Sequence, residues 1–175
     1  MAAPVGTNSF TSTESKKSEQ TLREVISEVI EVPEFENFSL ARSYSVNEIY
    51  NSTIATTKTG RDTTSEPDTG LLYYRGKVVG LGDNKWQKSN NNACQRIFQF
   101  LADSITLKLD SKRVFVVLDG PGFESINESG HVPGQSGGTL VRCQHHFTTL
   151  VCPKKSEITK EFKKYLRRIM IEEEQ

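Results

Sequence analysis

The sequence predicts an α/β protein in which a central mixed β-sheet is flanked by helices, and three observations lead to this prediction. Helical periodicity occurs near both ends of the chain, from Glu19 to about Val32 and from Glu157 to about Glu173. Between them lie apolar runs of strand length, and RVFVVL at 113–118 is almost continuously apolar, as expected of a strand buried on both faces. Because helical and strand segments follow one another along the chain, we expect the sheet to be covered by helices.

Length and composition indicate one domain without a membrane segment. The chain has 175 residues, and no apolar run approaches the roughly 18 residues that a spanning helix needs. The first residues lack the basic and apolar regions of a secretory signal peptide. The three cysteines, Cys94, Cys143 and Cys152, cannot all pair with one another, so reduced thiols in a cytoplasmic protein are the simplest interpretation.

The charge of the chain is balanced overall but divided along its length. The formal net charge is zero, yet residues 1–68 carry 6 basic and 11 acidic side chains, whereas residues 69–175 carry 16 basic and 11 acidic ones. A neutral protein gains no general attraction to nucleic acid, so contact with DNA requires a local basic face.

The N-terminal part divides into a tail and a helix. Residues 1–18 are rich in Ser, Thr, Ala and Lys, and we expect a poorly ordered tail there, followed by a single domain over 19–175. The helix from Glu19 carries apolar residues at helical spacing and ends at Pro33. These apolar residues are Leu22, Val25, Ile26, Val29 and Ile30.

A β-hairpin is predicted in the middle of the chain. Its first strand is Leu71 to Tyr74, its turn is Arg75-Gly76, and its second strand starts at Lys77. Ser45-Val46-Asn47-Glu48 has the spacing of a capping box, so a short helix is expected to start there, and residues 56–67 are predicted to form a loop.

The remaining elements are predicted from periodicity and turn residues. An apolar stripe indicates a helix from Asn90 to about Leu107, and strands are expected at 139–143 and 147–152. Residues 119–138 contain six glycines and two prolines and are predicted to be a long loop. The C-terminal helix has an apolar stripe formed by Ile158, Phe162, Tyr165, Leu166 and Ile169.

The chemistry of the chain is predicted to lie at the hairpin. On the second strand, alternation places Asp83 and Lys85 on one face, and Asp68 precedes the first strand. Two carboxylates can hold Mg²⁺, and the backbone carbonyl of Asn84 can be a third ligand. Lys85 then points at an attacking water or at a phosphate, which is the arrangement that phosphodiester hydrolysis requires.

This pattern resembles the PD-(D/E)xK nuclease superfamily, and within it the EcoRI-like type II restriction endonucleases. The motif stands here as Pro67-Asp68 followed by Asp83-Asn84-Lys85. Asn92-Ala93-Cys94-Gln95-Arg96 is similar to the family's Asn-Ala-x-x-Arg, and RVFVVLDGPGF resembles the strand and turn that follow. The resemblance covers roughly residues 40–123. The chain departs from the family in having Asp83 where the nearest relatives usually carry Glu, and in a short segment between Lys85 and Asn92.

The resemblance implies a three-layer α/β/α restriction-endonuclease fold and a type II endodeoxyribonuclease that depends on Mg²⁺, with Mn²⁺ as a substitute. It further implies a homodimer acting on double-stranded DNA. Asp68 and Asp83 would be metal ligands and Lys85 the catalytic lysine. The expected DNA contacts are Asn92, Arg96, Gln87 and Lys88.

Two other functions remain open from the sequence. One is a repair or junction-cleaving nuclease of the same fold. The other is a non-catalytic nucleic-acid-binding module, with a zinc ion held by a soft ligand set. The candidate zinc ligands are Cys143, His145, His146 and Cys152.

Overall fold

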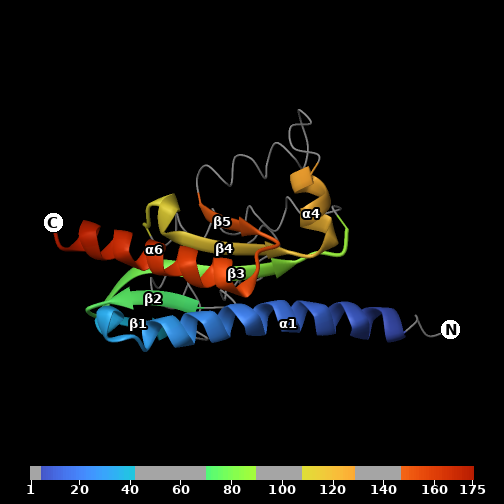
Figure 1. Cartoon of the computed structure of the whole chain (residues 1–175), viewed down its shortest axis with the longest axis horizontal. Coiled ribbons are helices and arrows are strands. Elements are labelled where there is room, and N and C mark those ends of the chain that lie inside the picture. Colours follow the sequence, from blue (N-terminus) through green and yellow to red (C-terminus); the bar gives the residue numbers. More distant parts are fainter. Residues whose placement is uncertain (1–4, 42–69, 90–107, 129–146) are drawn as a thin grey trace, which may run out of the picture.

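The computed structural model describes residues 5–41, 70–89, 108–128 and 147–175, which form a five-stranded β-sheet with three α-helices (Figure 1). In chain order the elements are α1 (Val5–Ile30), the 3-10 helix η1 (Pro33–Phe35), β1 (Phe38–Ala41), β2 (Gly70–Tyr74), β3 (Lys77–Trp86), the 3-10 helix η3 (Ser111–Arg113), β4 (Val114–Asp119), α4 (Pro121–Glu128), β5 (Thr148–Val151) and α6 (Lys155–Glu173).

The sheet is mixed, and its direction of pairing changes at β3. The strands lie side by side in chain order, from β1 at one edge to β5 at the other. β2 is antiparallel to both β1 and β3, whereas β4 is parallel to both β3 and β5. The predicted α/β class and mixed sheet are therefore confirmed. β3, the strand that carries Asp83 and Lys85, has a hairpin neighbour on one side and a buried parallel neighbour on the other.

Apolar side chains fill both faces of the sheet, and β4 contributes to both. Phe115 and Val117 belong to the cluster formed with α1 and α6. Val116 and Leu118 belong to the opposite cluster, where Phe123 of α4 also lies. Because successive side chains of a strand alternate between faces, a nearly continuous apolar run is what a central strand covered on both sides requires. In Figure 1, α1 and α6 lie beside each other, away from α4.

Several predicted elements are confirmed. The hairpin turn is Arg75-Gly76, where both residues have positive φ, 49° and 80°, as a tight two-residue turn demands. β4 begins and ends one residue later than the strand predicted at 113–118, and β5 lies within the strand predicted at 147–152. α6 buries all five residues of the predicted stripe. The segments at 45–50, 90–107 and 139–143 lie outside the described residues.

Three expectations differ from the structure. α1 begins at Val5, so residues 5–18 are helical and do not form the poorly ordered tail that composition predicts. Residues 121–128, predicted as part of a long loop, form α4, because Pro121 suits the first turn of a helix and Phe123 is fully buried against the sheet. β1 was not predicted, since its four residues carry too short a pattern to be recognised.

One irregularity in β3 brings this strand close to α6. The register shifts between Leu72 and Tyr73, which leaves Val79 as an extra residue of β3. Gly80 then faces α6, where a Cβ atom would overlap the hydroxyl of Tyr165. The glycine is therefore needed for close packing of α6 on the sheet.

Within the described part of the chain, no helix combines the length and the apolar character that crossing a membrane requires.

Candidate functional site

Asp83 and Lys85 lie on the same face of β3, as their spacing predicts. The Asp83 side chain is 4% exposed and that of Lys85 is 24% exposed, and 3.7 Å separates Lys85 Nζ from Asp83 Oδ1. The backbone N–H of Asn84 donates a 2.8 Å hydrogen bond to the same Oδ1 atom. A buried carboxylate is costly unless charges and donors surround it. Both are present here, so the Asp83 carboxylate is held in one position on a rigid strand.

The side chain of Asn84 projects to the opposite face of the sheet. It is buried, and its Nδ2 donates a 2.8 Å hydrogen bond to Oγ of Ser18 on α1. Ser18 Oγ in turn donates to Asp119 Oδ2 at 2.8 Å, and the backbone N–H of Gly120 donates to Asp119 Oδ1 at 3.0 Å. A chain of polar contacts therefore crosses from β3 to α1 and on to the end of β4.

Ser18 and Asp119 were not predicted as members of the site. From composition, Ser18 is predicted to lie in a poorly ordered tail and Asp119 at the start of a long loop. One signal in the sequence was present, since Ser18 precedes Leu22 by four residues and Val25 by seven, which puts it on the buried stripe of α1. A serine at a core-facing position of a helix needs a partner, and the partner is Asn84.

The turn after β4 fixes the end of β3. The N–H of Gln87 donates to the carbonyl of Asp119 at 3.0 Å, and the N–H of Gly122 donates to the carbonyl of Gln87 at 2.9 Å. Gly120 has φ 96°, and a Cβ atom there would lie 2.4 Å from the carbonyl oxygen of Gln87 and 3.0 Å from the Trp86 ring. Of the two predicted DNA contacts in this segment, Gln87 is half-buried and Lys88 is exposed.

The other predicted site residues are not placed by the structure. Asp68, Asn92 and Arg96 lie outside the described residues. Among the residues that are described, no three carboxylate, imidazole or thiol groups gather as a metal site would require. Gly70, two residues after Asp68, begins β2 and pairs with Gly82, the neighbour of Asp83.

Cys152 is the described member of the predicted zinc set. Its thiol donates a 3.4 Å hydrogen bond to the carbonyl of Gly120. Burial, together with the charges of Asp119 and Glu124, raises the pKa of Cys152 to about 11. The thiol is therefore protonated at neutral pH and is bonded to the backbone of the turn after β4. Cys143, His145 and His146 lie outside the described residues.

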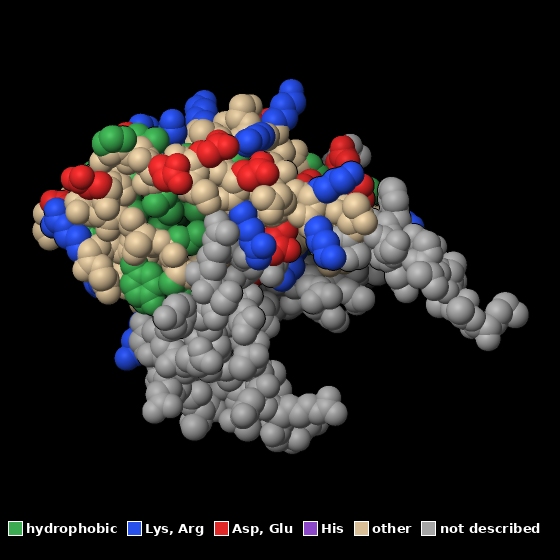
Figure 2. Space-filling model, turned by 90° about the horizontal axis from the view of Figure 1, so that it is seen from below, with side chains coloured by type: hydrophobic (Ala, Val, Ile, Leu, Met, Phe, Trp, Pro, Cys, Tyr) green, Lys and Arg blue, Asp and Glu red, His purple; other side chains and the backbone are tan. Residues whose placement is uncertain are grey.

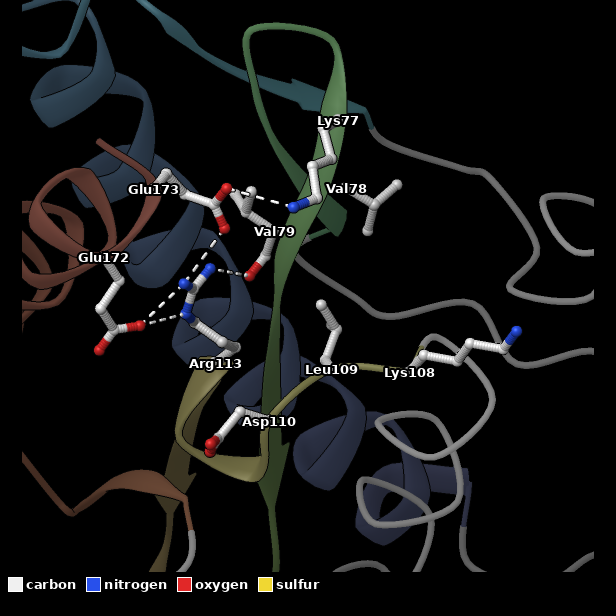
Figure 3. Close-up of a pocket in the computed structure, with 9 residues that line it drawn as sticks. All are labelled: Lys77, Val78, Val79, Lys108, Leu109, Asp110, Arg113, Glu172 and Glu173. Carbon is white, nitrogen blue, oxygen red and sulfur yellow. Dashed lines mark hydrogen bonds and ion pairs between the residues drawn. The ribbon is translucent and has the colours of Figure 1, made fainter. Parts of the chain in front are cut away.

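A cavity of about 370 Å³ lies at the other end of β3, away from Asp83. Figure 3 shows the side chains of Glu172 and Glu173 turned toward Arg113, with Lys77 reaching Glu173. The Arg113 guanidinium also donates to the carbonyl of Val79 at 3.0 Å. Because these charges satisfy one another, we interpret this cluster as a structural clamp between β3 and α6.

The face seen in Figure 2 carries charges of both signs. Over the described part of that face, Lys and Arg side chains are interspersed with Asp and Glu side chains. On α6, Arg167 forms hydrogen bonds of 2.7 and 3.1 Å to Glu34, and Arg168 donates to the carbonyl of Lys112 at 2.6 Å. These two arginines of α6 therefore already interact with other groups of the protein.

Comparisons with known proteins add no relative: no protein-family model, no curated protein and no solved structure matches the chain. The structure itself defines an α/β protein with a five-stranded mixed sheet. Its site must therefore be interpreted from its own residues.

Proposed function

We propose that the chain is a metal-dependent endonuclease of the restriction type, which hydrolyses phosphodiester bonds of double-stranded DNA at a specific short sequence. The observation that carries the proposal is the Asp83–Lys85 pair, in which a buried carboxylate lies 3.7 Å from an ammonium on one face of β3. A carboxylate that can hold a metal ion, beside an ammonium that can reach a phosphate, suits in-line attack of water on a phosphodiester.

The chain contains a second Asp-x-Lys sequence, which sharpens the proposal. Asp110 and Lys112 stand at the same spacing before β4. Both are exposed, and Asp110 Oδ1 accepts the N–H of Lys112 at 2.9 Å in a turn. Spacing alone therefore does not single out Asp83 and Lys85. The burial of Asp83 and the position of both residues on a central strand do.

Mg²⁺ suits the donors that this site offers. It is a hard cation that takes carboxylate and carbonyl oxygens, and Mn²⁺ accepts the same ligands. Asp83 would hold it together with Asp68 and the backbone carbonyl of Asn84. The pairing of β2 with β3 supports these ligands, because Gly70 follows Asp68 by two residues and pairs with Gly82, the residue before Asp83. When bound, the cation supplies charge neutralisation at the phosphate.

In this proposal Lys85 is the residue that acts on the water and the phosphate. Its side chain is partly exposed while its charge remains beside Asp83, so the ammonium can turn toward a bound phosphate. There it orients the attacking water and stabilises negative charge on the phosphate oxygens. By resemblance the products carry 5′-phosphate and 3′-hydroxyl ends.

Sequence recognition is assigned to the segment that follows β3. Asn92 and Arg96 would read base edges, where a bidentate contact contributes about 1–3 kcal/mol of discrimination. Lys88, which is exposed, and Gln87 would contact phosphates close to the site. Cleavage of both strands at a palindrome requires two-fold symmetry, so we propose a homodimer acting in the cytoplasm.

Cleavage of supercoiled plasmid DNA in Mg²⁺, Mn²⁺ or EDTA tests the proposal. The wild type should give discrete fragments with either metal and none with EDTA. Asp83→Asn, which keeps the size of the buried side chain, and Lys85→Ala should each lower the rate by at least about 100-fold, as expected when a catalytic group is removed. A branched DNA substrate is assayed in parallel with linear DNA. A junction-cleaving enzyme would cut the branched substrate and leave the linear one intact.

The matched controls are Asp110→Asn and Lys112→Ala, because they alter the exposed pair of the same spacing. These variants should cleave at the wild-type rate. A wild type that neither nicks nor cuts DNA under any of these metals contradicts the proposal. Equal losses in both pairs of variants would also count against it, since the site would then not lie at Asp83.

A further inference from the structure

Asn84 occupies the position between the two proposed catalytic residues, yet its side chain is committed to the opposite face of the sheet. It is buried, and its amide donates to Ser18 Oγ at 2.8 Å. An apolar side chain at this position could pack against α1 without any hydrogen-bond partner. The amide instead requires one specific hydrogen-bond acceptor, and a buried polar pair of this kind fixes the relative position of the elements that carry it.

Ser18 is itself held from a third element. Its hydroxyl donates to Asp119 Oδ2 at 2.8 Å, and Asp119 is the last residue of β4. Asp119 Oδ1 accepts the N–H of Gly120, which fixes the carboxylate. The Ser18 hydroxyl thus donates to a fixed carboxylate, and its lone pair points at Asn84. The serine is oriented on both sides and cannot rotate away without losing one of the two bonds.

The strand at this point depends on these contacts. In the described residues the pairing of β3 with β2 ends at Gly70 opposite Gly82, whereas β3 pairs with β4 from Leu81 to Trp86, so that from Asp83 onward β4 is its one described strand neighbour. Because side chains alternate along a strand, an anchor on residue 84 sets the direction of residues 83 and 85 on the other face. A shift of about 1 Å at a reacting group lowers a rate by roughly 100-fold.

We propose that Ser18 is a positioning residue, which through Asn84 holds Asp83 and Lys85 in the geometry for hydrolysis. This inference rests on the proposed nuclease function and extends it to a residue of α1 on the far side of the sheet. Ser18 touches neither DNA nor metal; it acts by fixing the backbone of β3.

The test compares Ser18→Ala with Ser18→Thr and with Thr21→Ala in the full-length protein. Thr21 is a matched control, because its hydroxyl bonds the Lys17 carbonyl of its own helix at 2.9 Å. Plasmid cleavage gives kcat and KM for each variant, and thermal unfolding reports stability. Ser18→Ala should lower kcat by about 10- to 100-fold, with KM changed less than about two-fold, as is found when a supporting residue is removed. Ser18→Thr, which retains the hydroxyl, should recover most of the rate, and Thr21→Ala should cleave as the wild type does.

The outcomes separate this proposal from the one on which it rests. If the wild type does not cleave, the nuclease function fails and the positioning role fails with it. If the wild type cleaves and Ser18→Ala retains its kcat, the positioning role alone is overturned, whatever happens to the unfolding temperature. Should Ser18→Ala not fold, Ser18→Cys is used, since a thiol of similar size is a weak hydrogen-bonding group. An unchanged kcat in that variant overturns the proposal in the same way.

Discussion

Gly80 shows how a single residue sets the distance between the sheet and α6. A Cβ atom at this position would overlap the Tyr165 hydroxyl and lie 3.0 Å from the carbonyl of Arg113. The Tyr165 hydroxyl donates to that same carbonyl, and burial raises the pKa of Tyr165 far above its ordinary value. The hydroxyl is therefore protonated and stays a donor over the whole physiological range of pH. Glycine at position 80 leaves room for this buried hydrogen bond.

Gly80→Ala should lower the free energy of unfolding by about 1–3 kcal/mol, because the added methyl group overpacks a site that is already filled. Chemical denaturation measures the change. In the double variant Gly80→Ala/Tyr165→Phe the hydroxyl is absent, so the loss should be smaller than the sum of the two single losses. Additive losses would show that the methyl group and the hydroxyl do not compete for one space.

At the scale of elements, the hairpin is attached to the C-terminal end of α6 by charge. That end carries Glu172, Glu173 and Glu174, although acidic groups at a helix C-terminus oppose the helix dipole. Basic side chains compensate: Arg113 lies 2.8 Å from Glu172, and Lys77 lies 3.2 Å from Glu173. Burial acts to raise the pKa of Glu173, but the hydrogen bonds and charges of Lys77 and Arg113 outweigh it, so that the pKa lies below its ordinary value.

Arg113→Met should destabilise the protein by about 1–3 kcal/mol, because it removes the hydrogen bonds that this buried guanidinium donates to the Val79 carbonyl and to two partly exposed glutamates. Lys155→Met is the matched control, because Lys155 also pairs with two glutamates, at 3.6 Å each, but its side chain is 49% exposed. Lys155→Met should lower the free energy of unfolding by less than about 1 kcal/mol. Unfolding curves for both variants provide the measurement.

The pH dependence of Arg113→Met follows from the lowered pKa of Glu173. A carboxyl group whose pKa is lowered in the folded state contributes stability above its ordinary pKa and loses it as pH falls through the lowered value. The difference between wild type and Arg113→Met should therefore shrink in acid. A difference that stays constant from neutral pH into that acidic range would contradict the ionic interpretation.

At the scale of the whole molecule, two apolar layers share one sheet. The α1–α6 layer and the α4 layer meet through β4, whose side chains enter each layer alternately. If either layer unfolded alone, the β4 side chains on that face of the sheet would be exposed to water. We therefore expect the described layers to unfold together.

Trp86 allows this to be measured, because it is the single tryptophan of the chain and lies at the end of β3 against Gly120. Denaturation followed by its fluorescence should coincide with denaturation followed by far-UV circular dichroism, as in a two-state transition. Phe115→Ala, in the layer facing α1 and α6, should lower both midpoints together, with a loss of about 3–5 kcal/mol. Two separate midpoints would show that the layers are independent units.

Most of the elements that could be predicted from the sequence were predicted from periodic patterns. The stripe of α6, the apolar run of β4 and the Arg75-Gly76 turn are local signals, and each is found where it was expected. α4 was missed because Gly122 and Pro121 indicate a turn when read alone. The burial of Phe123 against β4 and its neighbours, which sequence does not display, decides in favour of a helix.

For the candidate site, the sequence by itself determined the alternation that puts Asp83 and Lys85 on one face of a strand, because this depends only on the period of the strand. It could not choose between this pair and Asp110 with Lys112, which have the same spacing. Only the tertiary structure made that distinction, by placing one pair on a central strand and the other in an exposed turn. It also decided that Ser18, 66 positions from Asn84 in sequence, lies within hydrogen-bonding distance of it. The physical reason is that burial and long-range contacts arise from the packing of whole elements, whereas periodicity is a property of each element alone.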